Sequence, residues 1–505
     1  MAPVSESTRT QAGQRVSAPG VRRRLPELKK PLILAAGAAL FAAAHLLPLP
    51  EPAMDPAGVS FALTAQGKAA LGLFLLALVW WTAEVVPIGV TGAAVVAIQA
   101  IFMIRPARAA LTDFMDPAVW FITGSLIMGM AFTKTGLARR AAYRTLVLVG
   151  ENTSVILLGC LLLTAGLTLV MAHTAVAATV YPLFMAVHAL YSEGNQPTRF
   201  GKALFIGMAL AAGAGSVITF LGSARAVIAA GFYAEMAGRR VGFLEISFYM
   251  FPVGAIMVAL AWALVMVLWP PEKKVVAGLR ERARRLHASL GPFSRREALA
   301  LAVIAAAVAV LSLQSVVPSL RAVDQSAILV AAAVMFFVLG VLNLDDLEGT
   351  PLNIIFLFGG AMSLGHCLWQ TGAARWVGVS LLGLFTPNPW HVFVLSVVLT
   401  VLLMTNLVLN VAVIAVSLPV AFVVAPYVGV STEAMFCAVL AAAGMPFMTL
   451  LGAAPNAIAY GSGQFTQREF LRAGLPASAA LVLLLGAFVW FVWPAMGMPV
   501  IAGKF

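Results

Sequence analysis

The chain contains two related blocks of sequence. Phe121–Arg139 (FITGSLIMGMAFTKTGLAR) aligns with Leu357–Arg375 (LFGGAMSLGHCLWQTGAAR), with Gly136 opposite Gly372. The alignment continues downstream, with small shifts, in two further pairs: Ala175–Pro182 with Ala412–Pro419, and Thr219–Gly231 with Thr449–Gly461. A duplicated block of apolar segments, interrupted by Gly and Pro, is typical of a secondary transporter whose site lies between two repeats.

The composition restricts the chain to a membrane. Hydrophobic residues make up 61% of it and charged residues only 10%, whereas a soluble globular chain carries about 25% charged residues. Folding in water could not bury so much apolar surface, so we predict an all-α polytopic membrane protein. The sequence also has no phosphate-binding loop, zinc-protease motif or nucleophile elbow, so no enzyme is expected.

Apolar runs of membrane-spanning length predict transmembrane helices. Eleven are expected, at about 31–49, 68–87, 90–105, 118–133, 203–230, 247–270, 297–316, 326–343, 353–370, 433–463 and 474–495. Two longer stretches, 154–190 and 392–426, break in the middle, at 171–174 (MAHT) and 407–410 (LVLN). Each predicts a re-entrant hairpin, because non-helical backbone at membrane depth is tolerated only inside protein or beside a water-filled cavity.

The basic residues predict the orientation. With a cytoplasmic N-terminus, the expected cytoplasmic segments hold 23 Lys and Arg and the outer segments hold 8, which leaves Arg225 inside a span. This bias follows the positive-inside rule, and it inverts the second repeat relative to the first. The net charge of +12 is therefore attributed to topology and to anionic lipid headgroups, and no nucleic-acid partner is expected.

Four regions follow from this topology. We expect a disordered cytoplasmic tail at 1–30, the first transmembrane helix and first repeat at 31–270, a basic cytoplasmic linker at 271–297, and the second, inverted repeat at 298–505. Abundant Ala and a preference for Arg over Lys suggest a bacterial source. The expected location is therefore the cytoplasmic (inner) membrane, with the lipid bilayer as a partner.

Three motifs resemble one known family. Trp80–Thr91 (WWTAEVVPIGVT), Phe358–Gly372 (FGGAMSLGHCLWQTG) and Gly452–Tyr460 (GAAPNAIAY) are similar to motifs of the divalent anion/sodium symporters, which include dicarboxylate, citrate and sulfate transporters. The resemblance covers about residues 70–495. It implies eleven helices and two hairpins in an inverted repeat, an elevator-type mechanism and a homodimer.

The same resemblance implies a Ser-Asn-Thr triplet at each hairpin tip, where a substrate carboxylate binds and sodium is held nearby. Here the triplets are Ala172-His173-Thr174 and Leu409-Asn410-Val411, and the first partner loop is Gly222-Ser223-Ala224-Arg225-Ala226. These departures leave three alternatives open for the substrate: a dicarboxylate or tricarboxylate, a smaller or monovalent anion, or an anion bound mostly by the first half.

Hairpin tips and broken helices expose backbone groups, and free N–H groups at a half-helix N-terminus attract an anion. The candidate substrate-binding residues are His173, Thr174, Gly222, Ser223, Arg225, Asn410 and Pro455. Arg225 could bind an anion directly or act as a fixed cation in place of a lost sodium ion. The non-functional alternative is that its side chain extends to the membrane interface. His173 could carry a proton or be structural.

Hard oxygen donors suit sodium. The candidate sodium ligands are Thr405, Asn410, Gly452 and Asn456 in the second half, with Thr168 as a further candidate in the first. No other cofactor is expected. The sequence therefore predicts a secondary transporter of a small anion, most simply a dicarboxylate or tricarboxylate, coupled to sodium, protons or exchange. The alternatives are a sulfate- or arsenite-type permease and a membrane scaffold or sensor that no longer transports.

Overall fold

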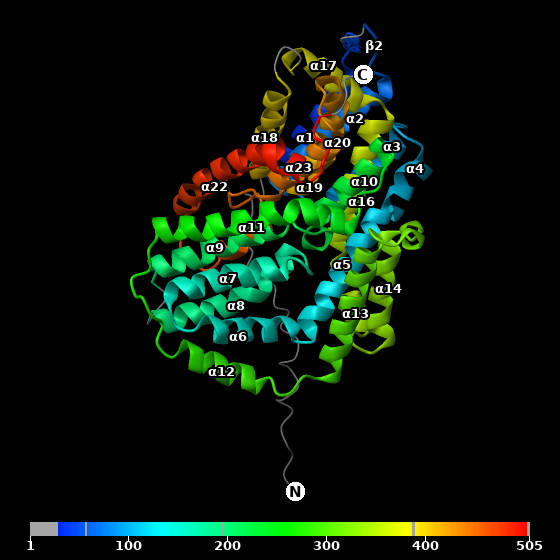
Figure 1. Cartoon of the computed structure of the whole chain (residues 1–505). Helices are drawn as coiled ribbons and strands as arrows, with labels where there is room; N and C mark the ends of the chain where they lie inside the picture. Colours follow the sequence, from blue (N-terminus) through cyan, green and yellow to red (C-terminus); the bar gives the residue numbers. More distant parts are fainter. Residues whose placement is uncertain (1–28, 56–57, 193–195, 386–388, 502–505) are drawn as a thin grey trace.

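The computed structural model describes residues 29–55, 58–192, 196–385 and 389–501 (Figure 1). Its described part is helical apart from isolated bridges and one small antiparallel hairpin of strands β1 (Ala53–Met54) and β2 (Ser60–Phe61). The tail expected at 1–30 lies outside the described residues up to residue 28.

The first half of the chain runs to residue 268. Its helices, including two 3₁₀ turns, are α1 (Lys29–Leu46), α2 (Ala65–Ala83), α3 (Ile88–Ile101), α4 (Ala107–Thr112), η1 (Asp113–Met115), α5 (Pro117–Lys134), α6 (Leu137–Val149), α7 (Thr153–Leu167), α8 (His173–Tyr191), α9 (Arg199–Gly215), η2 (Phe220–Gly222), α10 (Ala224–Ala237) and α11 (Phe243–Leu268).

The second half follows a surface helix in the basic linker. The helices are α12 (Leu279–Ser289), α13 (Arg295–Leu313), η3 (Pro318–Ala322), α14 (Gln325–Val338), α15 (Leu344–Glu348), α16 (Leu352–Gln370), α17 (Ala373–Phe385), α18 (Trp390–Leu407), α19 (Asn410–Val424), η4 (Ala425–Val428), α20 (Thr432–Gly444), α21 (Ala454–Tyr460), α22 (Gln467–Ala487), the π-helical η5 (Phe488–Val492) and α23 (Trp493–Ala495).

Two expected spans are broken rather than continuous. The run 203–230 is divided between α9 and α10 by residues 216–223, and the run 433–463 between α20 and α21 by residues 445–453. The glycines and prolines of both runs predicted broken spans, and the structure shows a break in each. Gly222 and Pro446 lie in the breaks; a proline N has no hydrogen to donate to a helix, and glycine favours irregular backbone.

Each expected hairpin is a pair of helices joined by a short turn. Helix α7 ends at Leu167 and α8 begins at His173, so the break begins three residues before the expected 171–174 segment and overlaps it. Helices α18 and α19 are separated by Val408 and Leu409 alone. In Figure 1, α7, α8 and α9 lie side by side below α11, and α18 and α19 lie near α20 and α22 above it.

Local sequence explains the helix boundaries. The side chains of Asn152, Thr198 and Ser431 accept hydrogen bonds from the first turns of α7, α9 and α20, as good N-caps do. Glycine allows α3 and α16 to pack closely, because a Cβ on Gly92 would lie 2.2 Å from the Phe356 carbonyl oxygen. Helix–helix contact through small residues is a usual device in membranes.

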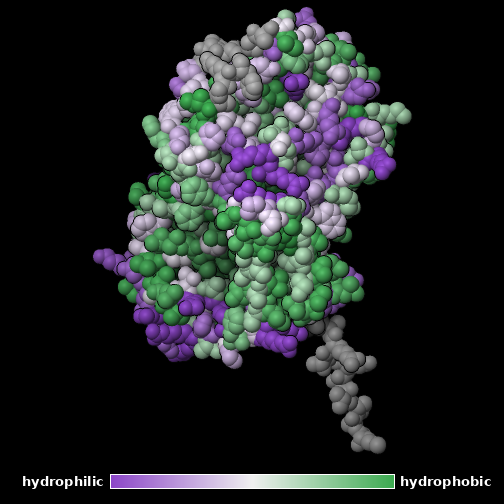
Figure 2. All heavy atoms as spheres, turned by 45° about the vertical axis from the view of Figure 1, so that its right-hand side comes forward, coloured by the Kyte–Doolittle hydropathy of each residue, from purple (hydrophilic) through white to green (hydrophobic). Residues whose placement is uncertain are grey.

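The helices are suited to a bilayer. In the described part of the chain, nine helical stretches are long and apolar enough to cross a membrane. Figure 2 shows a hydrophobic surface on the lower front of the molecule, on the side of α13 and α14, with hydrophilic residues below and above it. Exposed Leu301, Leu313, Val334 and Met335 on these two helices contribute to this surface. The chain is thus an all-α, multi-helix membrane protein.

Candidate functional site

A cavity of about 760 Å³ lies between the two halves of the chain. Four helix N-termini meet at it, two from each half. The residues at these ends that line the cavity are 172–175 at the start of α8, 223–224 at the start of α10, 409–411 at the start of α19 and 452–454 at the start of α21. The first N–H groups of a helix have no partner within the helix, so this junction attracts negative charge.

Polar side chains without a partner face the same cavity. Within the described residues, Ser125, Thr174, Ser223 and Asn410 line the cavity and make no hydrogen bond through their side chains. Ser223 is 3% exposed and Asn410 is 9% exposed. Three of the four belong to helix N-termini, so free donors gather where the helix ends already attract an anion.

The remaining wall is apolar. Phe121 on α5 and Phe220 in η2 meet edge to face, with ring centroids 6.2 Å apart. Further lining residues of this wall are Ile122, Leu126, Met130, Leu221, Val227, Ile354, Leu357 and Phe358. Lys134 and Asp346 also line the cavity and form an ion pair with each other. The cavity therefore combines polar groups at the helix N-termini with an extensive hydrophobic lining.

The first broken helix is fastened to the tip of the first hairpin. His173 Nδ1 lies 3.2 Å from the Gly222 carbonyl oxygen, and the Thr219 hydroxyl donates to the Leu169 carbonyl at 3.0 Å. A Cβ on Gly222 would lie 2.6 Å from the Thr168 carbonyl oxygen, so only glycine allows this approach. The sequence from Thr219 to Gly222 is thus held directly against the hairpin.

The second broken helix makes equivalent contacts. The Thr449 hydroxyl donates to the Asn406 carbonyl, and a Cβ on Gly452 would lie 3.0 Å from the Thr405 carbonyl oxygen. Thr449 and Gly452 align with Thr219 and Gly222 in the sequence repeat. The repeat is therefore present in the contacts of the folded chain as well as in its sequence.

The two halves differ behind these contacts. In the second half, the Asn456 amide donates to the carbonyls of Pro446 at 2.8 Å and Thr449 at 2.9 Å. In the first half, Arg225 Nη2 donates to the Ser216 hydroxyl at 2.5 Å. Ser216 in turn donates to the Gly213 carbonyl. The start of the helix after the break is therefore bonded to the break by a neutral amide in the second half and by a cation in the first.

Arg225 is completely buried. Its Nε and Nη1 atoms have no hydrogen-bond partner, and it forms no ion pair, within the described part of the chain. The guanidinium lies against Gly444 at the end of α20, because a Cβ there would be 2.9 Å from Nη2. Snorkelling to the interface is therefore not what this side chain does. A buried cation without a carboxylate is costly and usually functional.

The sequence-predicted residues fall into two layers. His173, Thr174, Ser223 and Asn410 line the cavity, and so does Gly452. Gly222 lies behind His173, and Arg225 lies behind the α10 N-terminus, whereas Pro455 is buried in the first turn of α21.

The predicted sodium ligands are also divided between these layers. Thr405 and Asn456 are buried behind the cavity, and their side chains donate to carbonyls. The Thr168 hydroxyl is buried and donates to the Ala165 carbonyl. Asn410 is the member of the set whose side chain is free, and it lines the cavity together with Gly452.

Sequence reasoning missed three polar residues, of which Ser125 lines the cavity. Asn406 Oδ1 accepts from the backbone N–H groups of Met448 at 2.8 Å and Thr449 at 3.2 Å, so this amide organises the second broken helix. Ser216 is the bonding partner of Arg225. Asn406 could have been found, since it adjoins Thr405 on an apolar helix; Ser216 had no comparable signal.

Comparisons with known proteins agree with this architecture. Residues 34–498 match the family described as the sodium:sulfate symporter transmembrane region. SdcS of Staphylococcus saprophyticus, a sodium-dependent dicarboxylate transporter, is 22% identical over 460 residues, which cover 87% of this chain and 88% of that protein. A protein of Cupriavidus necator described as a membrane protein is 25% identical over 478 residues, covering 89% and 92%.

A solved structure shares the fold. MtrF of Neisseria gonorrhoeae, described with a class of antimetabolite efflux pumps, has a TM-score of 0.59 and 13% identity, and the match covers 96% of this chain and 98% of that one. The family is one of transporters and not of enzymes. The chain belongs to the sodium:sulfate symporter (divalent anion/sodium symporter) family and is a multi-pass secondary transporter, as its sequence motifs predicted.

Proposed function

We propose that this protein carries a small organic anion across the cytoplasmic membrane, and that the anion's carboxylate binds where the four helix N-termini meet. The observation that carries this proposal is the junction itself: residues 172–175, 223–224, 409–411 and 452–454 line one cavity. Backbone N–H groups and the free side chains of Thr174, Ser223 and Asn410 supply donors there. Such a site recognises an anion without needing a carboxylate-binding arginine in contact with it.

The transport mechanism follows from the arrangement of the halves. We infer eleven transmembrane helices and two re-entrant hairpins in an inverted repeat, with the N-terminus in the cytoplasm. The cavity lies between the hairpin tips and broken helices on one side and α5 and α16 on the other. Movement of the first group past the second, as in an elevator, would expose the anion alternately to the two sides of the membrane.

Sodium coupling, if the protein uses it, belongs to the second half. Among the described residues, the Asn410 amide oxygen is free and lines the cavity, and the Thr405 backbone carbonyl lies against Gly452. Amide and carbonyl oxygens are suitable ligands for sodium. The first half has the Arg225 cation in the corresponding loop, which would repel a second sodium ion. We therefore propose at most one sodium site, at Thr405, Asn410, Gly452 and Asn456.

The proposal is tested with purified protein in liposomes. Uptake of labelled monocarboxylates, dicarboxylates, tricarboxylates and sulfate is measured with and without a sodium gradient. Thr174→Val, which removes a free hydroxyl and keeps the shape, is expected to weaken uptake of the accepted anion several-fold. Thr145→Val is the matched control, because the Thr145 hydroxyl bonds within α6 outside the cavity. Failure of every anion to enter the liposomes would contradict the proposal.

The family resemblance also supports a homodimer, and we propose one. Mass measurement of the protein in a lipid nanodisc is expected to give twice the mass of the 52.9 kDa chain. A single-chain mass at concentrations where transport is active would contradict the dimer without affecting the proposed substrate site.

A further inference from the structure

We infer that the transported anion is a monoanion with an apolar body, and that Arg225 is the fixed positive charge that balances it. The inference rests on the proposed function and names the substrate class of the same cavity. Two observations carry it: the charges around the cavity, and the hydrophobic residues that form much of its lining.

The charges around the cavity sum to one unpaired cation. Among the described residues that line it, Lys134 and Asp346 bear opposite charges and pair with each other. Arg225 lies directly behind the α10 N-terminus, and among the residues that the structure describes it has no carboxylate partner and two of its three nitrogens are unbonded. Charge interactions inside protein are much stronger than in water, so an anion at the junction would experience this cation through the intervening backbone.

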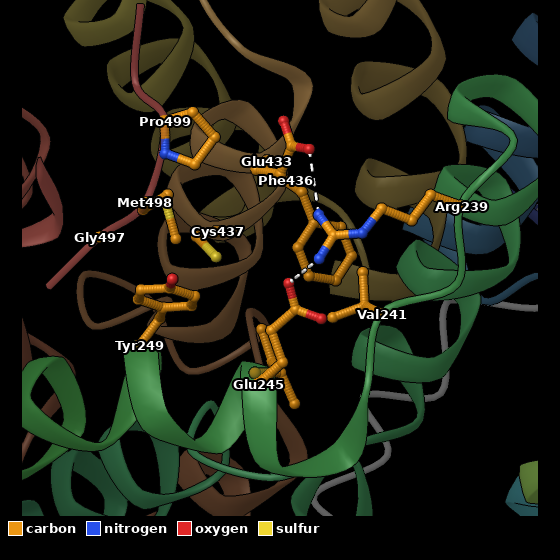
Figure 3. Close-up of a pocket in the computed structure, with 11 residues that line it drawn as sticks. Arg239, Val241, Glu245, Tyr249, Glu433, Phe436, Cys437, Gly497, Met498 and Pro499 are labelled. Atoms are coloured by element: carbon orange, nitrogen blue, oxygen red, sulfur yellow. Dashed lines mark hydrogen bonds and ion pairs between the residues drawn. The ribbon is translucent and has the colours of Figure 1, made fainter. Parts of the chain in front are cut away.

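A second arginine in the same part of the chain, Arg239, has its positive charge balanced by carboxylates. Arg239 follows α10 and bridges Glu245 at 2.6 Å and Glu433 at 3.2 Å, at the edge of a smaller cavity of about 130 Å³ (Figure 3). Burial would lower the pKa of Arg239, but the charge of Glu245 and its other partners raises the pKa above the ordinary value. Arg239 is exposed, but Arg105 is buried, as Arg225 is, and it pairs with Asp113 at 2.7 Å. Arg225 has no such partner in the described chain.

One buried positive charge favours an anion with one negative charge. A monoanion at the helix N-termini makes the site neutral overall. A dicarboxylate or sulfate would bring a second charge into a cavity whose remaining wall is hydrophobic, and an unpaired buried charge is strongly unfavourable. A dianion would therefore need an accompanying cation, whereas a monoanion would not.

The hydrophobic wall fits an apolar body. Phe121, Leu126 and Met130 on α5 face the cavity together with Phe220 of η2 and Phe358 of α16. The volume of about 760 Å³ is within the range of sites that enclose drug-sized ligands. Aromatic and branched side chains bind apolar groups by excluding water from them. A compact polar dianion would leave most of this surface unused.

Arg225 does not line the cavity, so we assign it as a positioning residue that acts through charge. Its guanidinium is bonded to Ser216 behind the α10 N-terminus and approaches α20 at Gly444. It would raise the affinity for any monoanion over an uncharged molecule of the same shape. This effect is separable from a structural role, which would affect charged and uncharged ligands equally.

The substrate class is tested by competition in sodium-free medium. Wild-type protein is incubated with phenylacetate, 4-methylpentanoate, succinate, sulfate and the uncharged phenylacetamide, and binding is measured by thermal shift and by uptake into liposomes. We expect the two apolar monoanions to bind at least tenfold more tightly than succinate or sulfate. Tighter binding of succinate or sulfate without sodium would overturn the inference but leave the anion carrier intact. Binding of no anion at all would instead contradict the proposed function.

The role of Arg225 is tested with Arg225→Gln and Arg225→Lys. Arg225→Gln is expected to reduce phenylacetate affinity at least tenfold while phenylacetamide affinity stays unchanged. Arg225→Lys keeps the positive charge and is expected to retain most of the wild-type affinity for phenylacetate. Arg239→Gln is the matched control, because its charge is balanced by two glutamates. An equal effect of Arg225→Gln on both ligands would show a merely structural role. If neither Arg225 variant folds, the ratio of phenylacetate to phenylacetamide binding in the wild type decides whether charge is recognised, and a ratio near one overturns the inference.

Discussion

The two broken helices of this transporter have the same backbone contacts but different chemistry. In each, a threonine hydroxyl donates to a carbonyl at the preceding hairpin tip, and a glycine packs against the neighbouring carbonyl: Thr219 and Gly222 in the first, Thr449 and Gly452 in the second. Behind these contacts, Arg225 is bonded to Ser216 in the first half, whereas Asn456 is bonded to Pro446 and Thr449 in the second.

Under the proposed function, this difference separates the contacts that the repeat needs for folding from the charge that it uses to bind its anion. Hydroxyl–carbonyl bonds and glycine contacts hold a broken helix to a hairpin, and both halves keep them. The side chain behind the break can vary, since an amide satisfies two carbonyls and a guanidinium satisfies one hydroxyl while adding a charge. A charge that is not needed for the architecture is best explained by a ligand of opposite sign.

The largest expected effect is a gain in stability from removing that charge. Arg225→Met should raise the unfolding free energy of the anion-free protein by about 1–4 kcal/mol. Replacing a buried ion pair by apolar groups is often stabilising by this amount, and Arg225 has no carboxylate partner among the described residues to offset its burial. Thermal unfolding in detergent measures it, and the same variant should no longer be stabilised by phenylacetate. A large loss of stability would show that Arg225 is structural and would remove the proposed difference between the halves.

The glycines should respond alike in the two halves. Gly222→Ala and Gly452→Ala place a methyl group within 2.6 Å of the Thr168 carbonyl oxygen and 2.4 Å of Pro446 Cβ, so each should lower stability by about 1–3 kcal/mol. Gly166→Ala is the control in the first hairpin, since its Cβ would meet nothing within 4 Å. It should be neutral or stabilising by up to about 1 kcal/mol. Loss in only one of the two halves would contradict the structural repeat.

The amide N–H groups of Asn456 should be structural, whereas its amide oxygen is the group proposed for sodium. Asn456→Leu leaves the carbonyls of Pro446 and Thr449 without their donor, which should cost about 1–3 kcal/mol. The melting temperature should fall for this variant and stay nearly constant for Ser462→Ala, whose hydroxyl bonds only within the next turn. An unchanged melting temperature for Asn456→Leu would mean that these carbonyls find other partners.

The smallest effects are expected from the paired threonines. Thr219→Val and Thr449→Val each remove one hydroxyl–carbonyl bond, so each should lower stability by about 1 kcal/mol. Chemical or thermal unfolding of the two variants, measured side by side, should give values that agree within experimental error. A clearly larger loss of stability for one of the two variants would show that the two contacts are equivalent in geometry but not in energy.

Sequence patterns predicted much of this fold. Apolar length predicted most spans, and the duplicated motifs predicted two halves whose contacts turn out to be equivalent. The amphipathic helices α6 and α12 lie outside the expected spans, and the breaks at 216–223 and 445–453 were not placed by hydropathy, because glycine and proline are frequent in membrane helices whether or not these break.

Only the residues of the candidate site that line the cavity could be predicted from the sequence. His173, Thr174, Ser223 and Asn410 line the cavity, because they occupy helix starts that the motifs identify. What the sequence could not show is which buried groups lack partners. Arg225 is notable for the missing carboxylate, and Asn406 for the loop that it organises. Both properties depend on residues far away in the chain.

The most direct test is a structure of the protein with 4-bromophenylacetate bound in the absence of sodium. We expect the carboxylate beside Thr174, Ser223 and Asn410 at the four helix N-termini, with the bromine toward Phe121 and Phe358. An anion bound elsewhere, or a carboxylate that faces the hydrophobic wall, would contradict the claim that this junction is the substrate site.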